Sequence, residues 1–138
     1  MIVICNMKRK YRFNETFFDD IDTEEKAYIL GFLFADGYNN EQRGVVSLSL
    51  QESDVEILHK ISESIENTLP LQFIDMKKYH KGKSHQNQYR LSLYSRHTST
   101  ILSKAGGYQS KSYSCTFPTI ISPPLIRHFI RGYFDGDG

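Results

Sequence analysis

Two aspartates end two similar apolar stretches, and they are the residues of this chain best suited to metal chemistry. The stretches are residues 27–37, AYILGFLFADG, and residues 128–138, HFIRGYFDGDG. Aligned on their final Asp-Gly, they pair Gly31 with Gly132 and Asp36 with Asp137. Two carboxylates held close together repel unless a cation lies between them, and Mg²⁺ takes such oxygen ligands together with phosphate oxygens. A pair of this kind could support the hydrolysis of phosphodiester bonds.

The elements that must position these carboxylates are two apolar helices. A glycine inside a helix costs about 1 kcal/mol relative to alanine, so a glycine at the same register in both predicts close packing through Gly31 and Gly132. Each helix should end in a small residue, an Asp and a Gly, which we interpret as a left-handed C-cap. If the helices pack as a pair, Asp36 and Asp137 lie side by side. Either stretch alone would be an ordinary core helix, and the match between the two favours a site.

The two stretches resemble the LAGLIDADG motif of homing endonucleases, and two copies in one chain resemble the single-chain members of that family. The resemblance implies an α+β fold, an αββαββα module whose curved, antiparallel, four-stranded sheet is covered by helices on one face, plus a second motif helix at the C-terminus. It implies a double-strand DNA endonuclease that uses Mg²⁺ or another divalent cation and is associated with intron or intein mobility.

The same resemblance implies roles for individual residues. Asp36 and Asp137 would bind metal and act in catalysis. The family places a basic residue near the metals, for which Lys111 is the candidate and Lys104 the substitute. Glu52 is a further catalytic candidate that would position water. The bare sheet face would lie along the major groove of DNA, where a two-stranded ribbon fits.

Alternating side chains predict the strands of this sheet. Residues 45–51 and 89–94 alternate as half-buried strands do, with these side chains directed to the core: Val46, Leu48, Leu50, Leu91 and Leu93. Residues 71–74 should form a further strand and residues 39–44 a turn. The outward side chains able to read base edges are Ser47, Ser49, Gln51, Arg90 and Ser92.

Capping signals predict the helices. Asp22 with Glu25 suggests a capping box for a helix that reaches about residue 35 and is buried on most sides. Ser53 with Glu56 suggests another, for a helix with an apolar stripe through residues 57, 61, 65 and 69 that ends at Pro70. A short helix should span residues 97–104. Ser122 should cap the last helix, with proline at its first position. The expected organisation is a loosely packed arm (1–21), one module (22–121) and the second motif helix (122–138).

Charge is distributed unevenly although the formal net charge is only +1. Acidic residues dominate from Glu15 to Glu66, and basic residues dominate from Leu71 to Ser112. This asymmetry suggests one face for a polyanion, and the residues expected to contact DNA phosphates are Lys77, Lys78, Lys81 and Lys83. Arg96 is a further candidate for DNA binding. A solvated lysine-rich hairpin tip would give the same pattern.

Cys5 and Cys115 are too few and too far apart for a disulfide framework, which favours a reducing compartment such as the cytoplasm or an organelle matrix. No apolar run reaches membrane-spanning length, and Met1–Cys5 is too short for a signal sequence, so we expect neither membrane insertion nor secretion.

The chain ends on the last residue of the second motif, Gly138. A complete single-chain member of the family needs another sheet module, so we expect half of an enzyme, weak or inactive alone, whose missing module belongs to a longer form or to a second copy. Two alternatives remain open. One is a DNA-binding or maturase-like splicing protein on the same fold that does not cleave. The other is an unrelated α+β domain whose motifs are accidental.

Overall fold

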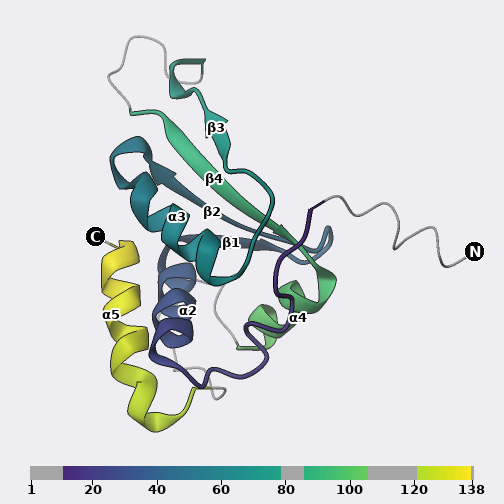
Figure 1. The fold of residues 1–138 in the computed structure, drawn as a ribbon, viewed down its shortest axis with the longest axis vertical. Helices are drawn as coiled ribbons and strands as arrows, with labels where there is room; N and C mark the ends of the chain where they lie inside the picture. The colour runs from purple at the N-terminus through teal and green to yellow at the C-terminus, as the bar shows by residue number, and fades with distance from the viewer. Residues whose placement is uncertain (1–10, 79–85, 106–120, 138) are drawn as a thin grey trace, which may run out of the picture.

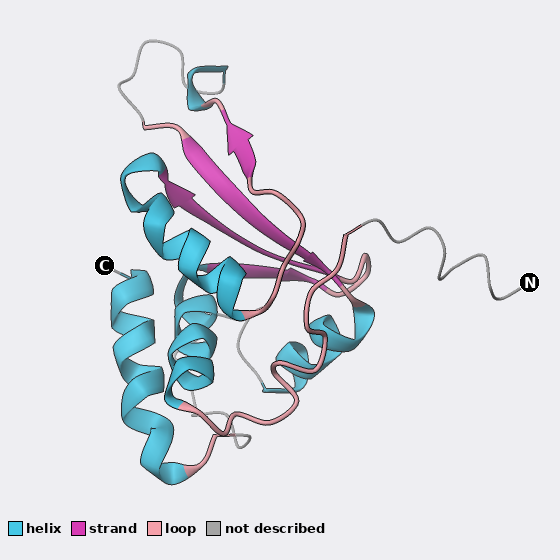
Figure 2. Cartoon of the chain, in the orientation of Figure 1, coloured by secondary structure: helices cyan, strands magenta, loops and turns pink. Residues whose placement is uncertain are grey.

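An antiparallel sheet of four strands forms the centre of the part of the chain that the computed structural model describes, residues 11–78, 86–105 and 121–137. The strands are β1 (Gly37–Asn40), β2 (Val45–Gln51), β3 (Gln72–Ile74) and β4 (Gln88–Tyr94). Their order across the sheet is β1-β2-β4-β3 (labelled in Figure 1 and coloured magenta in Figure 2). The four helices of this part are α2 (Glu24–Asp36), α3 (Val55–Ser64), α4 (Arg96–Ala105) and α5 (Ile126–Asp137) (Figure 1). The predicted α+β class is confirmed.

The two faces of the sheet differ as the alternation predicts. The five side chains expected to face the core are all buried: Val46, Leu48, Leu50, Leu91 and Leu93. Strand pairing places Leu48 beside Leu91, so both strands present their apolar side chains to the same face. Helices α3 and α4 contact this sheet through β2, and α2 does so as well. The other face carries polar side chains and forms the candidate site described below.

Strand β1 includes two residues of the turn predicted over residues 39–44, so the predicted start of that turn is wrong. The turn occupies residues 41–44, and Asn39 and Asn40 belong to the strand, where they pair with β2. Asn39 is 1% exposed, and its amide nitrogen donates to the carbonyl of Ser99 on α4 at 2.9 Å. Buried hydrogen bonds to α4 therefore outweigh the turn preference of two consecutive asparagines.

Both predicted capping boxes are wrong. Helix α2 is capped by Thr23, whose hydroxyl accepts from the amide of Lys26 at 3.1 Å, and not by Asp22. Ahead of α3 the chain forms a 3₁₀ turn, Glu52–Asp54, and the amide of Ser53 donates to the side chain of Gln86 at 3.2 Å. The N-cap residue of α3 is Asp54, and its side chain makes no capping hydrogen bond, so Ser53 does not cap this helix.

Helix α3 ends earlier than predicted. Its last residue is Ser64, and Glu66 has a left-handed φ of 55°, so Leu69 lies beyond the helix. The stripe is correct as far as the helix runs, since Ile61 is buried and Ile65 follows it into the core. The stop thus comes from the backbone at Glu66 and not from Pro70.

Gly37 does not form the predicted left-handed cap. Its φ of −81° and ψ of 168° are extended, and it begins β1 directly after α2. A Cβ at this position would lie 2.6 Å from the carbonyl oxygen of Leu33. Glycine is therefore needed here for space and not for its φ angle.

The segment before α2 is packed tightly, contrary to the prediction of a loose arm, in its described part. Phe17, Phe18 and Ile21 are 4%, 1% and 2% exposed and belong to the core. Ile21 forms a parallel bridge with Ile121, and the carboxylate of Glu15 accepts from Ser95 at 2.7 Å. Aromatic side chains of a segment without regular structure thus complete the core.

The last helix begins after a 3₁₀ turn, Pro123–Leu125, with Ser122 at its N-cap position. The Ser122 side chain makes no capping hydrogen bond; its carbonyl accepts from the amide of Leu125 at 2.9 Å. Helix α5 follows at Ile126 and lies beside α2 (Figure 1). The two apolar stretches identified in the sequence are therefore neighbours in the fold.

Candidate functional site

The two glycines predicted to bring the helices together do so. A Cβ on Gly31 would lie 2.0 Å from the backbone oxygen of Phe129, and one on Gly132 would lie 2.0 Å from the backbone oxygen of Tyr28. Neither position can hold a larger residue without separating the helix backbones, because the obstructing atoms are backbone oxygens. The cost of glycine inside each helix is offset by this close approach.

These contacts are related by a local two-fold axis. Every residue of the second stretch lies 101 positions after its counterpart in the first, and Phe129 is the counterpart of Tyr28. The contact of Gly31 with Phe129 and that of Gly132 with Tyr28 are therefore the same contact seen from each helix. Such reciprocity defines an isologous, two-fold interface, here within one chain.

The axis passes between Ala35 and Gly136. These two residues are counterparts of each other, and a Cβ on Gly136 would lie 3.0 Å from the Cβ of Ala35. Asp36 and Asp137 follow them directly. The paired helices thus run in the same direction and bring their terminal aspartates to the same end, beside the axis. Both carboxyl-bearing residues are exposed.

A hollow lies between the ends of these helices and the end of β2. The helix-end hollow is lined by Phe32, Asp36, Ser49, Leu50, Gln51, Asp54, Ile57, Gln88, Asp135 and Gly136. Asp36 and Asp135 line it, whereas Asp137 occupies the last turn of α5 without contributing to the lining. Carboxylate and amide oxygens suit Mg²⁺, which keeps several waters and needs only one or two protein carboxylates. The oxygen donors of this hollow therefore fit such a cation.

Asp135 was not selected from the sequence as a site residue. Its carboxylate accepts a hydrogen bond from the Tyr28 hydroxyl at 2.6 Å, and the guanidinium of Arg131 lies 4.5 Å from the centre of the Tyr28 ring. Burial, then the hydrogen bond and negative charge of Asp135, raise the pKa of Tyr28 to about 12. Asp135 matches Phe34 in the alignment, so the two copies of the motif carry no shared signal that could have identified it.

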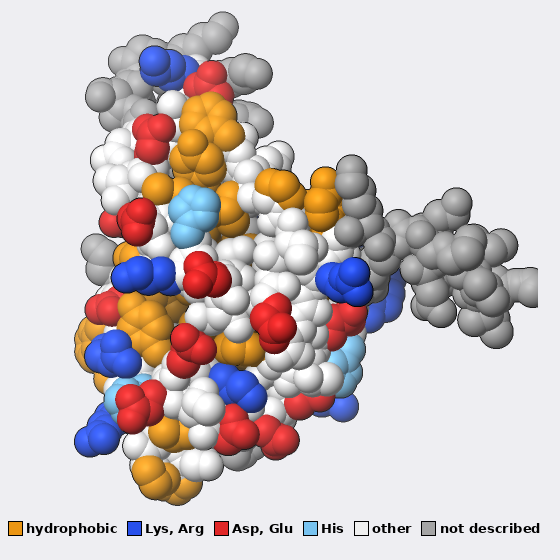
Figure 3. Space-filling model, in the orientation of Figure 1, with side chains coloured by type: hydrophobic (Ala, Val, Ile, Leu, Met, Phe, Trp, Pro, Cys, Tyr) orange, Lys and Arg blue, Asp and Glu red, His pale blue; other side chains and the backbone are white. Residues whose placement is uncertain are grey.

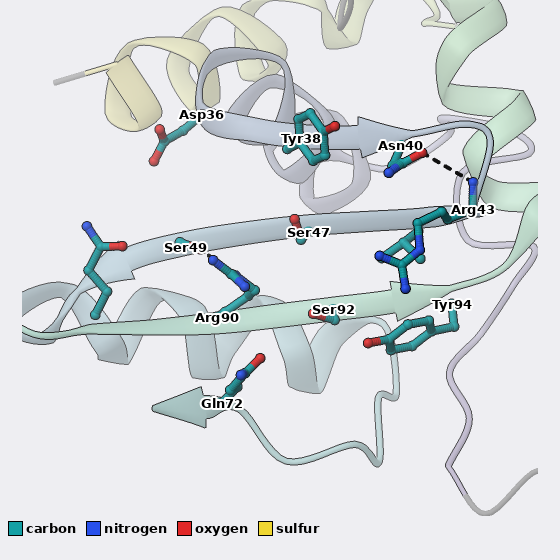
Figure 4. Close-up of a pocket in the computed structure, with 12 residues that line it drawn as sticks. Asp36, Tyr38, Asn40, Arg43, Ser47, Ser49, Gln72, Arg90, Ser92 and Tyr94 are labelled. Atoms are coloured by element: carbon teal, nitrogen blue, oxygen red, sulfur yellow. Dashed lines mark hydrogen bonds between the residues drawn. The ribbon is translucent and has the colours of Figure 1, made fainter. Parts of the chain in front are cut away.

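The exposed face of the sheet forms a second, broader hollow beside Asp36. This open face is lined by Asp36, Tyr38, Asn40, Arg43, Val45, Ser47, Ser49, Gln72, Gln88, Arg90, Ser92 and Tyr94. Figure 4 shows these side chains spread over all four strands, with Asp36 at one end and Arg43 and Tyr94 at the other. The Arg90 guanidinium donates to the Ser49 hydroxyl at 3.1 Å. Donors, acceptors and exposed rings are thus arrayed along one surface.

Four of the five strand residues predicted to read bases line this open face: Ser47, Ser49, Arg90 and Ser92. The fifth, Gln51, lines the helix-end hollow at the end of β2. Tyr38 and Asn40 are not among the predicted site residues, because no strand was expected before the turn predicted over residues 39–44. Alternation along residues 37–40 would have placed both on the same face, and Arg43 lies in the turn that connects them to β2.

The remaining predicted residues that the structure describes line neither hollow. Glu52 is exposed at the start of the 3₁₀ turn after β2. Arg96 begins α4, and its guanidinium donates to the carbonyl of Gln42 at 3.1 Å, beside the turn that carries Arg43. Lys77 is exposed and Lys78 ends the same 3₁₀ turn, Met76–Lys78. Lys81, Lys83 and Lys111 lie outside the described residues.

Charges on the view of Figure 3 are mixed, with acidic and basic side chains interspersed over the helices. Within the described ranges, no group of three or more His, Cys, Asp or Glu side chains is placed to hold a metal ion. Any cation at the helix ends would therefore rely on two carboxylates, with water or phosphate completing its shell. No helix in the described part of the chain has the length and apolarity to cross a membrane.

Comparisons of the chain with protein-family models and with curated proteins find no match. Functional conclusions therefore depend on the geometry of the helix pair and of the open face.

Proposed function

We propose that this chain is the sheet module and paired motif helix of a LAGLIDADG-type, sequence-specific DNA endonuclease that hydrolyses phosphodiester bonds with Mg²⁺ or another divalent cation. The observation that carries the proposal is the reciprocal contact of Gly31 and Gly132 across a local two-fold axis, with an aspartate ending each helix. An accidental resemblance to the motif would have to include both its repetition in the sequence and the symmetric packing of the two helices.

Asp36 and Asp137 would hold the cation in this proposal. Bound Mg²⁺ stabilises negative charge on the attacking and leaving oxygens of a phosphodiester. The chain's own contribution is to fix the carboxylates: Gly31 and Gly132 allow the backbone contact, and Ala35 packs beside Gly136 one residue earlier. Asp135 lines the same hollow as Asp36, but its carboxylate accepts the hydrogen bond from Tyr28 at 2.6 Å.

The open face would bind duplex DNA. It is contiguous with Asp36, so DNA lying along it would pass the end of the helix pair. Ser47, Ser49, Arg90 and Ser92 carry groups that hydrogen-bond base edges, and Tyr38 and Tyr94 are 62% and 58% exposed on the same surface. The basic residues at 77, 78, 81 and 83 would contact phosphates.

Little or no double-strand cleavage is expected from the 138-residue chain acting alone. Positioning of reactants supplies up to about 7–11 kcal/mol of barrier reduction, and the described residues provide one sheet to position DNA. A second copy of the chain, or a further module, would have to provide the other half of the clamp.

A non-cleaving DNA-binding or maturase-like protein on the same fold is the second candidate. It is favoured by one observation, that Asp36 lines the helix-end hollow and Asp137 does not. Such a protein would keep the open face and have no use for a metal at the helix ends.

Calorimetric titration with Mg²⁺ separates the two candidates. The endonuclease proposal expects binding by the wild type, and at least about a tenfold loss of affinity in both Asp36→Asn and Asp137→Asn, because each carboxylate is a ligand. Asp22→Asn, the same change at a carboxylate paired with Lys26 at 3.1 Å, serves as the control. Equal affinity in all four proteins would favour the non-cleaving candidate.

A further inference from the structure

The two sides of the α2–α5 interface are related by the local axis but differ in chemistry. On one side the hydroxyl of Tyr28 donates to Asp135 at 2.6 Å. On the other side the counterparts of these residues, Phe129 and Phe34, pack edge to face with ring centres 5.3 Å apart. Symmetry places the two contacts at equivalent positions, one polar and one aromatic.

Burial follows the same division. Phe34 and Phe129 are 4% and 3% exposed, whereas Tyr28 is half-buried and Asp135 is exposed. The aromatic pair thus lies on the buried side and the polar pair on the more exposed side. An unpaired carboxylate among the buried rings would be costly.

The residues on the axis are also unequal. Ala35 faces Gly136, and a Cβ on Gly136 would lie 3.0 Å from both the Cβ of Ala35 and the carbonyl oxygen of Phe32. One alanine and one glycine fit at this crossing, whereas two alanines would make a contact tighter than Cβ atoms normally make, so the neighbouring atoms would have to shift.

A second copy of α2 in the place of α5 would lack each of these contacts. Phe34 would then face Tyr28, and both hydroxyls of the symmetric pair would be without their acceptor. Ala35 would meet its own copy at the axis. Leu30, the counterpart of Arg131, would replace the guanidinium that lies 4.5 Å from the Tyr28 ring.

We propose that Tyr28 and Ala35 on α2, with Asp135 and Gly136 on α5, form a pairing code that selects α5 as the partner of α2 and disfavours an α2–α2 interface between two copies. The mechanism is a hydrogen bond that only the mixed pair satisfies, combined with an axial contact that only the mixed pair fits. Features that penalise a wrong partner are a common source of specificity.

The code can be tested within one chain by exchanging its residues. Asp135→Phe with Gly136→Ala gives α5 the residues that a second α2 would present. Tyr28→Phe with Ala35→Gly gives α2 the residues of α5. Combining all four restores a matched aromatic pair and a glycine–alanine crossing, with the roles of the helices exchanged.

Amide hydrogen exchange of α5 measures its docking directly. Each pair of substitutions should speed exchange by about tenfold or more, as expected when a hydrogen bond or a close-packed crossing is removed. The fourfold variant should return to within about threefold of the wild type. Ser92→Ala, on the open face, is the control. Its effect on the exchange of α5 should simply add to that of either pair of substitutions, because Ser92 is not part of the interface between the helices.

A fourfold variant whose exchange rates equal the product of the two separate effects would overturn the code. If the paired substitutions prevent folding, recovery of folding in the fourfold variant supports the code, and failure to recover contradicts it. The milder cycle of Tyr28→Phe and Asp135→Asn keeps the chain close to wild type and should also be non-additive. None of these measurements involves DNA or metal, so their outcome is independent of the proposed endonuclease activity.

Discussion

Tyr28 is the residue whose titration reports most directly on the contact between α2 and α5. Burial, the hydrogen bond to Asp135 and its negative charge raise the pKa of Tyr28 from 10.0 to about 12. The folded-state pKa lies above the unfolded value, so neutral Tyr28 stabilises the folded state. This contribution is fully present below about pH 10 and is lost as the pH rises through about 12.

Ultraviolet titration of tyrosinate checks this expectation. The difference between wild type and Tyr28→Phe should appear at the high-pH end of the curve, and Asp135→Asn should move it toward lower pH because one cause of the raised pKa is removed. A difference curve centred near the ordinary tyrosine pKa of about 10 would contradict the contact.

At the scale of elements, the sequence predicts what depends on periodicity and misses what depends on tertiary partners. The faces of β2 and β4 follow from alternation, because one buried face specifies the register. The close pairing of two helices follows from glycines at matching register. Strand β1 could not be predicted in this way, because the hydrogen bond from Asn39 to Ser99 that holds it joins residues 60 positions apart.

The residues of the candidate site also fall into those that periodicity predicts and those that depend on tertiary contacts. Asp36, Ser47 and Ser92 could be placed from repetition and alternation, and the structure brings all three onto the open face. Asp135 could not, because it becomes part of the site only through the packing of α5 against Tyr28. Arg43 lies in a turn, where no periodic pattern indicates which face a side chain joins.

Gly132→Ala should weaken the helix pair. Its new Cβ would lie 2.0 Å from the Tyr28 carbonyl oxygen, and overpacking of this kind costs about 1–3 kcal/mol, against which alanine regains about 1 kcal/mol of helix propensity. The midpoint of urea unfolding should therefore fall. Gly136→Ala, whose nearest contact would be 3.0 Å, should lower it less. Equal midpoints for both variants and the wild type would mean that the backbones are not in contact at Gly132.

On the scale of the whole molecule, the sheet separates two surfaces with different composition. Helices cover one face, and their exposed surface mixes both signs of charge (Figure 3). The other face presents polar side chains and leads to Asp36 (Figure 4). Under the proposed function, a duplex would contact the open face and the lysines at positions 77, 78, 81 and 83.

Replacing Lys77, Lys78, Lys81 and Lys83 with glutamine should weaken binding to all duplex sequences alike. The slope of log affinity against log salt should become shallower by about 0.9 for each phosphate that a lysine no longer neutralises. Fluorescence anisotropy at several salt concentrations gives this slope. Lys60→Gln, an exposed lysine on α3, is the matched control on the helix side and should leave the slope unchanged. An unaltered slope in the fourfold lysine variant would mean that these lysines do not contact DNA phosphates.

The coupling between Mg²⁺ and duplex DNA tests the central claim most directly, because a cation held by Asp36 and Asp137 beside bound DNA must link the two affinities. DNA affinity is measured at constant ionic strength with and without Mg²⁺. Mg²⁺ should raise the affinity of the wild type, whereas Asp36→Asn should bind DNA more tightly without metal, since one repulsive charge is gone, and should respond little to Mg²⁺. A Mg²⁺ response that is absent in the wild type, or unchanged in Asp36→Asn, would contradict a metal site formed by the helix pair.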